Sequence, residues 1–170
     1  MNKPSITEKT NSILKEIQRD FGFIPNLAKE MSTSPQTLEI YFKGNTILKH
    51  TVLPEKERRM VMLLVAYFNE CVYCQAVHKK GAKQAGVNQE EVEAWRIDKG
   101  INTDRGKALS LATRLLLSKK GWLTQENLEK LEDRGIDRQQ LYEIIAIIGL
   151  QTISNYINHI AGTEIDEEFK

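Results

Sequence analysis

Cysteine and proline are scarce in this sequence of 170 residues, which contains two cysteines and four prolines. Two cysteines cannot supply the several crosslinks that hold a small secreted domain together. The opening residues, MNKPSITEKTN, are polar and contain no apolar signal core. We therefore expect a cytoplasmic protein, in which two cysteines spaced C-x-x-C are typical of redox chemistry or metal binding.

The sequence also has neither an excess of one charge nor a long apolar run. Its 24 Lys and Arg residues balance 23 Asp and Glu residues, which leaves a formal charge of +1. No basic stripe with interleaved aromatic residues is present, so we expect no nucleic-acid partner. The longest apolar run, Met60–Phe68, has nine residues and is too short to span a bilayer. We therefore predict no membrane contact.

What is present is an ordinary globular composition. Hydrophobic residues make up 41% of the chain and charged residues 28%. The length suits a single domain, residues 1–170. No alternating apolar and polar pattern extends beyond a few residues, and no internal repeat is found. The sequence therefore predicts an all-α fold of eight or nine helices in one bundle.

Capping residues, prolines and glycines mark the helix boundaries. Ser34 before Pro35 predicts a helix that runs to about His50. The helix from Pro54 to Asn69 contains the long apolar run, so we expect it at the centre of the domain. The other predicted helices span approximately residues 5–22, 71–86, 88–95, 103–121, 124–135 and 137–162.

Both cysteines lie in one short segment, NECVYCQAVH, residues 69–78. At about 100° per residue, Cys71, Cys74 and His78 share one face of the predicted helix. Cys71 lies at the helix N-terminus, where free N–H groups and the macrodipole stabilise a thiolate. His78 could accept a proton from Cys74 or donate one to a leaving oxygen. This spacing is that of a two-thiol redox centre.

Two other interpretations of this segment remain open at the level of the residues. Free cysteines are often small buried hydrophobic residues without chemistry. A zinc site would have Cys71, Cys74 and His78 as three ligands and would need a water or another side chain as the fourth. The remaining histidines, His50 and His159, lie far away in the sequence. We expect a redox pair without a metal or cofactor.

The segment LPEKERRMVMLLVAYFNECVYCQAVH, residues 53–78, resembles a known family. It is similar to the core of the carboxymuconolactone decarboxylase-like superfamily, in its AhpD-like (alkylhydroperoxidase D, peroxidase-related) branch. The core motif region extends over residues 53–86. FGFIPNLAKEMSTSPQTLEIY and NYINHIAGTEID resemble the N-terminal part and the C-terminal helix and tail of the peroxidase-related members. The resemblance therefore covers most of the chain.

The resemblance implies an AhpD-like all-α fold that assembles into homotrimers or homohexamers. It also implies that Cys71 and Cys74 reduce hydroperoxides, or relay electrons to a peroxidase, with His78 as a proton relay. A thiol–disulfide reductant protein would restore the pair. We expect Cys74, beside His78, to meet the peroxide, and Cys71, at an exposed helix start, to exchange with the reductant.

One position departs from the family pattern. Members usually have a glutamate twelve residues before the first cysteine, where this chain has Arg59. An arginine there would lower thiol pKa values or hold an anionic substrate, or it would be a solvated or salt-bridged residue. The alternatives to a thiol peroxidase are a non-redox decarboxylase-type enzyme acting on a small organic acid, and a structural module with inert thiols.

Overall fold

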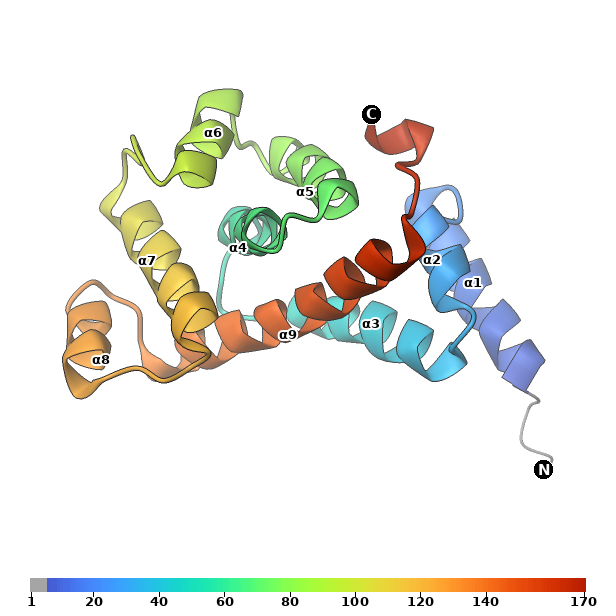
Figure 1. Cartoon of the computed structure of the whole chain (residues 1–170), viewed down its shortest axis with the longest axis horizontal. Coiled ribbons are helices and arrows are strands. Elements are labelled where there is room, and N and C mark those ends of the chain that lie inside the picture. The colour runs from blue at the N-terminus through green and yellow to red at the C-terminus, as the bar shows by residue number, and fades with distance from the viewer. Residues whose placement is uncertain (1–5) are drawn as a thin grey trace.

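The computed structural model describes residues 6–170, with side chains described from residue 8 onward. This part of the chain is all-α, as predicted, and contains no strand (Figure 1). The helices are α1 (Ile6–Phe21), α2 (Asn26–Met31), α3 (Pro35–Leu48), α4 (Glu55–Phe68), α5 (Val72–Gln84), α6 (Gln89–Ile97), α7 (Asp104–Lys119), α8 (Gln125–Glu132) and α9 (Arg138–Ala161), with a short 3-10 helix at Glu167–Phe169. The predicted start of the first helix, at Ser5, lies outside the described residues.

The described helix boundaries follow the capping signals. The Ser34 side chain accepts a hydrogen bond from a backbone N–H in the first turn of α3. Thr124 with Asn127, and Asp137 with Gln140, form capping boxes at the starts of α8 and α9. These side chains satisfy N–H groups that a helix start leaves unpaired, and the predicted starts of these three helices are confirmed.

Helix α4 lies at the centre of the fold, as its apolar run predicts. It packs against α5, α6, α7 and α9, and Figure 1 shows it end-on among them. Every residue from Met60 to Ala66 is buried. A helix segment that is apolar on all sides buries its apolar surface only when other helices surround it, which explains this position.

Helix α9 connects the two halves of the hydrophobic core. Its first half packs in the larger cluster through Ile144 and Ile147. Its second half runs beside α2 and α3 toward a smaller cluster, which contains Tyr41, Cys71 and Cys74 (Figure 1). The cysteines therefore lie in the interior of the domain, next to the C-terminal half of α9.

By length and composition alone, α9 is the one described helix that could cross a membrane. Core helices of soluble proteins pass the same test, and α9 packs against α2, α3, α4, α5 and α7. It also buries Gln151, Asn155 and Asn158, which have hydrogen-bonding groups that lipid could not satisfy. These contacts are those of a core helix.

The chain after α9 is attached to the cysteine helix. The Tyr73 hydroxyl donates to a carboxylate oxygen of Asp166 over 2.6 Å. The same carboxylate accepts the backbone N–H of Asn26, at the start of α2, over 3.0 and 3.2 Å. A single buried carboxylate thus holds together α2, α5 and the C-terminal segment.

Candidate functional site

The two cysteines meet at the first turn of α5. Cys71 is the N-cap residue, and its sulfur accepts the backbone N–H of Cys74 over 3.4 Å. The two Sγ atoms are 2.7 Å apart, and both cysteines are free thiols. Their exposed fractions are only 1% and 2%. The expectation that Cys71 lies at an exposed helix start is therefore wrong, because α9 and the smaller core cluster cover that end of α5.

Polar side chains of α9 surround the thiols. The Asn158 amide donates to the Cys74 sulfur over 3.2 Å and to the Cys71 sulfur over 3.8 Å. The Ser154 hydroxyl lies 3.9 Å from the Cys74 sulfur. Asn155 accepts the side-chain amide of Asn69 over 2.8 Å, beside the turn that leads into α5. These α9 residues share one helix face and are contributed from a distant part of the chain.

Sequence reasoning did not identify these α9 residues. The available signal is a stripe of polar residues at helical spacing within an otherwise apolar helix, formed by Gln151, Ser154, Asn155 and Asn158. Such a stripe costs free energy unless its groups find partners, so it indicates a polar site inside the domain.

The two thiols have opposite pKa shifts. Hydrogen bonding from Cys74 lowers the pKa of Cys71 to about 6, with further help from the Cys74 backbone N–H and from Asn158, although burial opposes the shift. The pKa of Cys74 is raised, first by its hydrogen bond to Cys71 and then by burial. The pair therefore favours one shared proton, with the negative charge on Cys71 at the helix N-terminus.

His78 is buried on the same helix but has a different partner. Its Nε2 lies 2.6 Å from the side-chain oxygen of Gln151, and its Nδ1 has no partner among the described residues. No described hydrogen bond joins His78 to either cysteine, so the predicted direct proton contact with Cys74 is not made. Burial, assisted by the positive charge of Arg59, lowers the pKa of His78 to about 4. The imidazole is neutral at pH 7.

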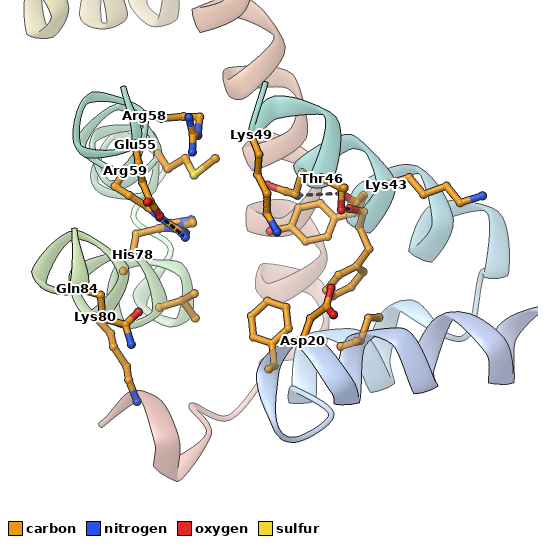
Figure 2. A pocket seen from close by; sticks show the side chains of 18 of the residues that line it. Asp20, Lys43, Thr46, Lys49, Glu55, Arg58, Arg59, His78, Lys80 and Gln84 are labelled. Atoms are coloured by element: carbon orange, nitrogen blue, oxygen red, sulfur yellow. Dashed lines mark hydrogen bonds and ion pairs between the residues drawn. The ribbon is translucent and has the colours of Figure 1, made fainter. Parts of the chain in front are cut away.

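A pocket of about 970 Å³ opens on the other side of His78. Figure 2 shows it between α4 and α5 on one side and α1 and α3 on the other. Both His78 and Tyr41 line it. Burial raises the pKa of Tyr41, and its interaction with the nearby pair Cys74 and Cys71 adds to the shift, so the phenol lies close to the thiols. His78, on the same helix as the cysteines, and Tyr41, which interacts electrostatically with them, therefore connect this pocket with the thiols.

Arg59 also lines this pocket. It pairs with Glu55 over 3.2 Å, and its charge acts on His78. Glu57 does not take the place of the missing family glutamate, because it forms an ion pair with Arg105 over 2.8 Å, away from the pocket. The position of the missing carboxylate is thus occupied by a cation beside the buried histidine.

No described group of three His, Cys, Asp or Glu side chains is arranged to hold a metal ion. Two of the three predicted site residues, Cys71 and Cys74, are brought into contact. The third, His78, is turned toward Gln151 and the pocket. The arrangement is that of a two-thiol centre with a separate neutral histidine.

Comparison with known proteins agrees with this fold. Residues 35–99, from α3 to just beyond α6, match the Carboxymuconolactone decarboxylase family. A search of curated proteins by sequence gave no significant match.

Solved structures share the architecture over nearly the whole chain. One is an alkylhydroperoxidase AhpD core, peroxidase-related protein from Ralstonia eutropha JMP134, with a TM-score of 0.83, 20% identity, and coverage of 99% of this chain and 93% of that one. A peroxidase-related protein from Silicibacter sp. TM1040 has a TM-score of 0.80, 18% identity, and coverage of 98% and 90%. The debrominase Bmp8 in complex with 2,3,4-tribromopyrrole has a TM-score of 0.74, 15% identity, and coverage of 99% and 91%.

The family match over residues 35–99 and the fold shared with the peroxidase-related structures support the predicted resemblance to the carboxymuconolactone decarboxylase and AhpD-like superfamily. The names of these proteins describe a decarboxylase, peroxidase-related proteins and a debrominase. The fold therefore supports more than one chemistry, and the function must be argued from the residues of the site.

Proposed function

We propose that the protein is a thiol-dependent oxidoreductase that reduces hydroperoxides with the Cys71–Cys74 pair. The observation that carries this proposal is the contact of two free thiols, 2.7 Å apart, of which Cys71 has a pKa lowered to about 6. A thiolate is the reactive form of cysteine, and a second thiol in contact can resolve the oxidised product.

In the first step, the Cys71 thiolate, and not Cys74 as expected from the sequence, attacks the terminal oxygen of the hydroperoxide, because the pKa of Cys71 is lowered and that of Cys74 is raised. The O–O bond breaks, the departing oxygen takes a proton to form an alcohol, and Cys71 becomes a sulfenic acid. In the second step, the Cys74 sulfur attacks the Cys71 sulfur, water leaves, and a disulfide forms. The peroxide has then gained the two electrons that the thiols have lost. A protein dithiol restores the pair by disulfide exchange.

His78 is the proposed proton relay beside this reaction. Its Nδ1 has no partner among the described residues, so the ring has one free position for a proton. With a pKa of about 4, the imidazole holds an extra proton only briefly at pH 7. This suits transfer between the pocket and the leaving oxygen rather than storage of the proton.

Single-turnover oxidation of the reduced protein by cumene hydroperoxide tests the proposal. In the wild type we expect one disulfide per peroxide consumed. In Cys74→Ser we expect a sulfenic acid on Cys71 that dimedone traps, because the resolving thiol is absent. In Cys71→Ser we expect a loss of rate of at least about tenfold, because the thiolate of lowered pKa is gone.

Val72→Ser is the matched control, since Val72 lies between the cysteines and its side chain is exposed. This variant should retain the wild-type rate. Fast peroxide consumption by Cys71→Ser would contradict the assignment of Cys71 as the attacking thiol, and inert thiols in the wild type would contradict the function itself.

The cationic lining of the pocket favours a second candidate, a non-redox enzyme acting on a small organic acid. Arg58, Arg59 and Lys49 all line the pocket, and neither cysteine does. Turnover of such an acid that survives in the Cys71→Ser, Cys74→Ser double variant would favour this candidate over the peroxidase.

A further inference from the structure

The pocket contains a buried guanidinium without a carboxylate partner. Arg58 is only 8% exposed, and its Nη1 donates to the backbone carbonyl of Leu53 over 3.1 Å. No described carboxylate forms an ion pair with it. Burial lowers the pKa of Arg58 and the positive charge of Arg59 adds to the shift, while the nearby Glu55 carboxylate, which pairs with Arg59, opposes it. A buried charge in this condition is costly unless an anion approaches it.

Two further cations share the pocket with incomplete pairing. Arg59 forms one ion pair, through its Nη2 with the exposed residue Glu55. Its Nε is buried and has no hydrogen-bond partner among the described residues. Lys49, the residue directly after α3, has no described ion pair. Figure 2 shows Arg58 and Arg59 extending from α4, and Lys49 extending from the end of α3 toward the same space.

The other charged groups of the pocket are already engaged or lie on a different wall. Lys43 pairs with Glu39, and the Lys80 ammonium donates to the backbone carbonyl of Glu168. The acidic residues on the α1 side are Glu16 and Asp20. The incompletely paired positive charge is therefore concentrated where α4 faces α3.

Apolar side chains make up another part of the wall. Side chains of Phe21, Phe42, Val77 and Phe169 line the pocket, as does the phenol of Tyr41 near the thiols. A volume of about 970 Å³ is in the range that holds an organic molecule of moderate size. The pocket thus combines a cationic end, suited to a carboxylate, with apolar walls suited to a hydrocarbon or aromatic body.

We infer that the substrate is an organic hydroperoxide that carries a carboxylate on an apolar body. The carboxylate binds Arg58, Arg59 and Lys49, the body packs against the phenylalanines, and the hydroperoxide is presented toward Tyr41 and the thiols. The electrons and atoms balance as in the two thiol steps given above. This substrate class rests on the proposed function, whereas the carboxylate-binding site can be tested without any redox step.

Calorimetric titration with a matched pair of non-peroxide probes tests the binding site. The probes are 4-isopropylbenzoate and its neutral amide, 4-isopropylbenzamide, which differ mainly in charge. The wild type should bind the carboxylate at least about tenfold more tightly, because charge-assisted hydrogen bonds to a buried guanidinium are among the stronger ones. Equal affinity for the two probes would overturn the inference.

Single substitutions of the cations test whether they cause the preference for the carboxylate probe over the amide. Arg58→Gln and Arg59→Gln should each reduce the preference for the carboxylate by about tenfold. Arg59 and Lys49 are the safer positions if Arg58→Gln does not fold, and Lys49→Gln should weaken carboxylate binding without affecting the amide. Lys83→Gln is the control, since Lys83 is exposed on α5 and does not line the pocket. A preference unchanged in both Arg59→Gln and Lys49→Gln would overturn the site.

A second readout separates this inference from the proposed function. Single-turnover thiol oxidation is compared for cumene hydroperoxide and its para-carboxylate at equal, low concentrations. We expect the carboxylate to react faster by about the ratio of the probe affinities. If the two peroxides oxidise the thiols at equal rates and the two probes bind with equal affinity, the carboxylate-bearing substrate class is wrong, while the proposed peroxidase function still holds. Carboxylate-selective binding without oxidation by either peroxide would overturn the peroxidase and its substrate, and leave the anion site standing.

Discussion

The lowered pKa of Cys71 depends on hydrogen bonds that its sulfur accepts. The Cys74 thiol, the Cys74 backbone N–H and the Asn158 amide all hydrogen-bond to its sulfur. Burial acts in the opposite direction, because it disfavours any charged form. Hydrogen bonding prevails at Cys71, whereas Cys74 has a raised pKa because it supplies a proton to its neighbour. In the proposed reaction, this asymmetry makes Cys71 the nucleophile and Cys74 the resolving thiol.

His78 makes stability depend on pH. Its pKa is depressed from an ordinary 6.5 to about 4, so between these values the unfolded chain binds a proton that the folded chain does not. Stability is therefore fully retained above about pH 6.5 and decreases as the pH falls toward 4, by up to about 3 kcal/mol from this residue. We expect this loss in urea unfolding curves of the wild type measured across that range.

The variant His78→Gln should show a smaller loss, because a neutral amide does not titrate. His50→Gln serves as the control, since His50 is exposed and outside the site. A pH profile of His78→Gln that parallels the wild type would show that the buried imidazole does not account for the effect.

Three elements meet at Asp166 in the C-terminal segment. Its buried carboxylate accepts the Tyr73 hydroxyl and the backbone N–H at the start of α2. Tyr73 lies between the two cysteines in sequence, so this contact fixes the helix that carries the thiols. Ile165 and Phe169 of this short segment pack on the smaller core cluster, and the charge-assisted hydrogen bonds of Asp166 add to these contacts in holding it in place.

Asp166→Ala should lower the free energy of unfolding by about 2 to 3 kcal/mol, because it leaves a buried hydroxyl and a backbone N–H without their acceptor. Denaturant titration followed by circular dichroism measures the change. Glu168→Ala, at an exposed position of the same segment, should change stability by less than about 0.5 kcal/mol. Equal effects of the two substitutions would mean that the segment contributes nothing through this carboxylate.

Several large apolar side chains are exposed on the described surface of the single chain. Those on α3 and α9, which run side by side in Figure 1, are Ile40, Ile47, Tyr142, Ile145, Tyr156 and Ile160. Exposed apolar surface of this kind is typical of protein–protein contacts. It supports the prediction, so far based on resemblance, that the protein forms a homotrimer or homohexamer.

Light scattering coupled to size-exclusion chromatography tests the assembly. The wild type should elute with three or six times the mass of one chain, which is 19.5 kDa. The double variant Ile145→Glu, Tyr156→Glu should dissociate, because burying two carboxylates at an apolar interface is costly. Ile97→Glu, exposed at the end of α6, is the control. A monomeric wild type at micromolar concentration would contradict the prediction.

Local interactions explain what the sequence determined by itself. Helix starts depend on a capping residue and the next three positions, and Cys71 and Cys74 lie within one turn, so their contact follows from helical spacing. The centre of the domain was predictable as well, because a run of nine apolar residues, of which Met60–Ala66 are all buried, is apolar on every side of α4.

Only the tertiary structure decided what surrounds the thiols. Asn158 is 84 residues from Cys74, and Gln151 is 73 residues from His78. No local signal specifies such pairs, because they form when α9 buries its apolar face against α4 and the domain closes around its core. That packing turns His78 away from Cys74, removes Cys71 from solvent and places an unpaired Arg58 in the pocket, so the chemistry of the site depends on long-range burial rather than on the motif alone.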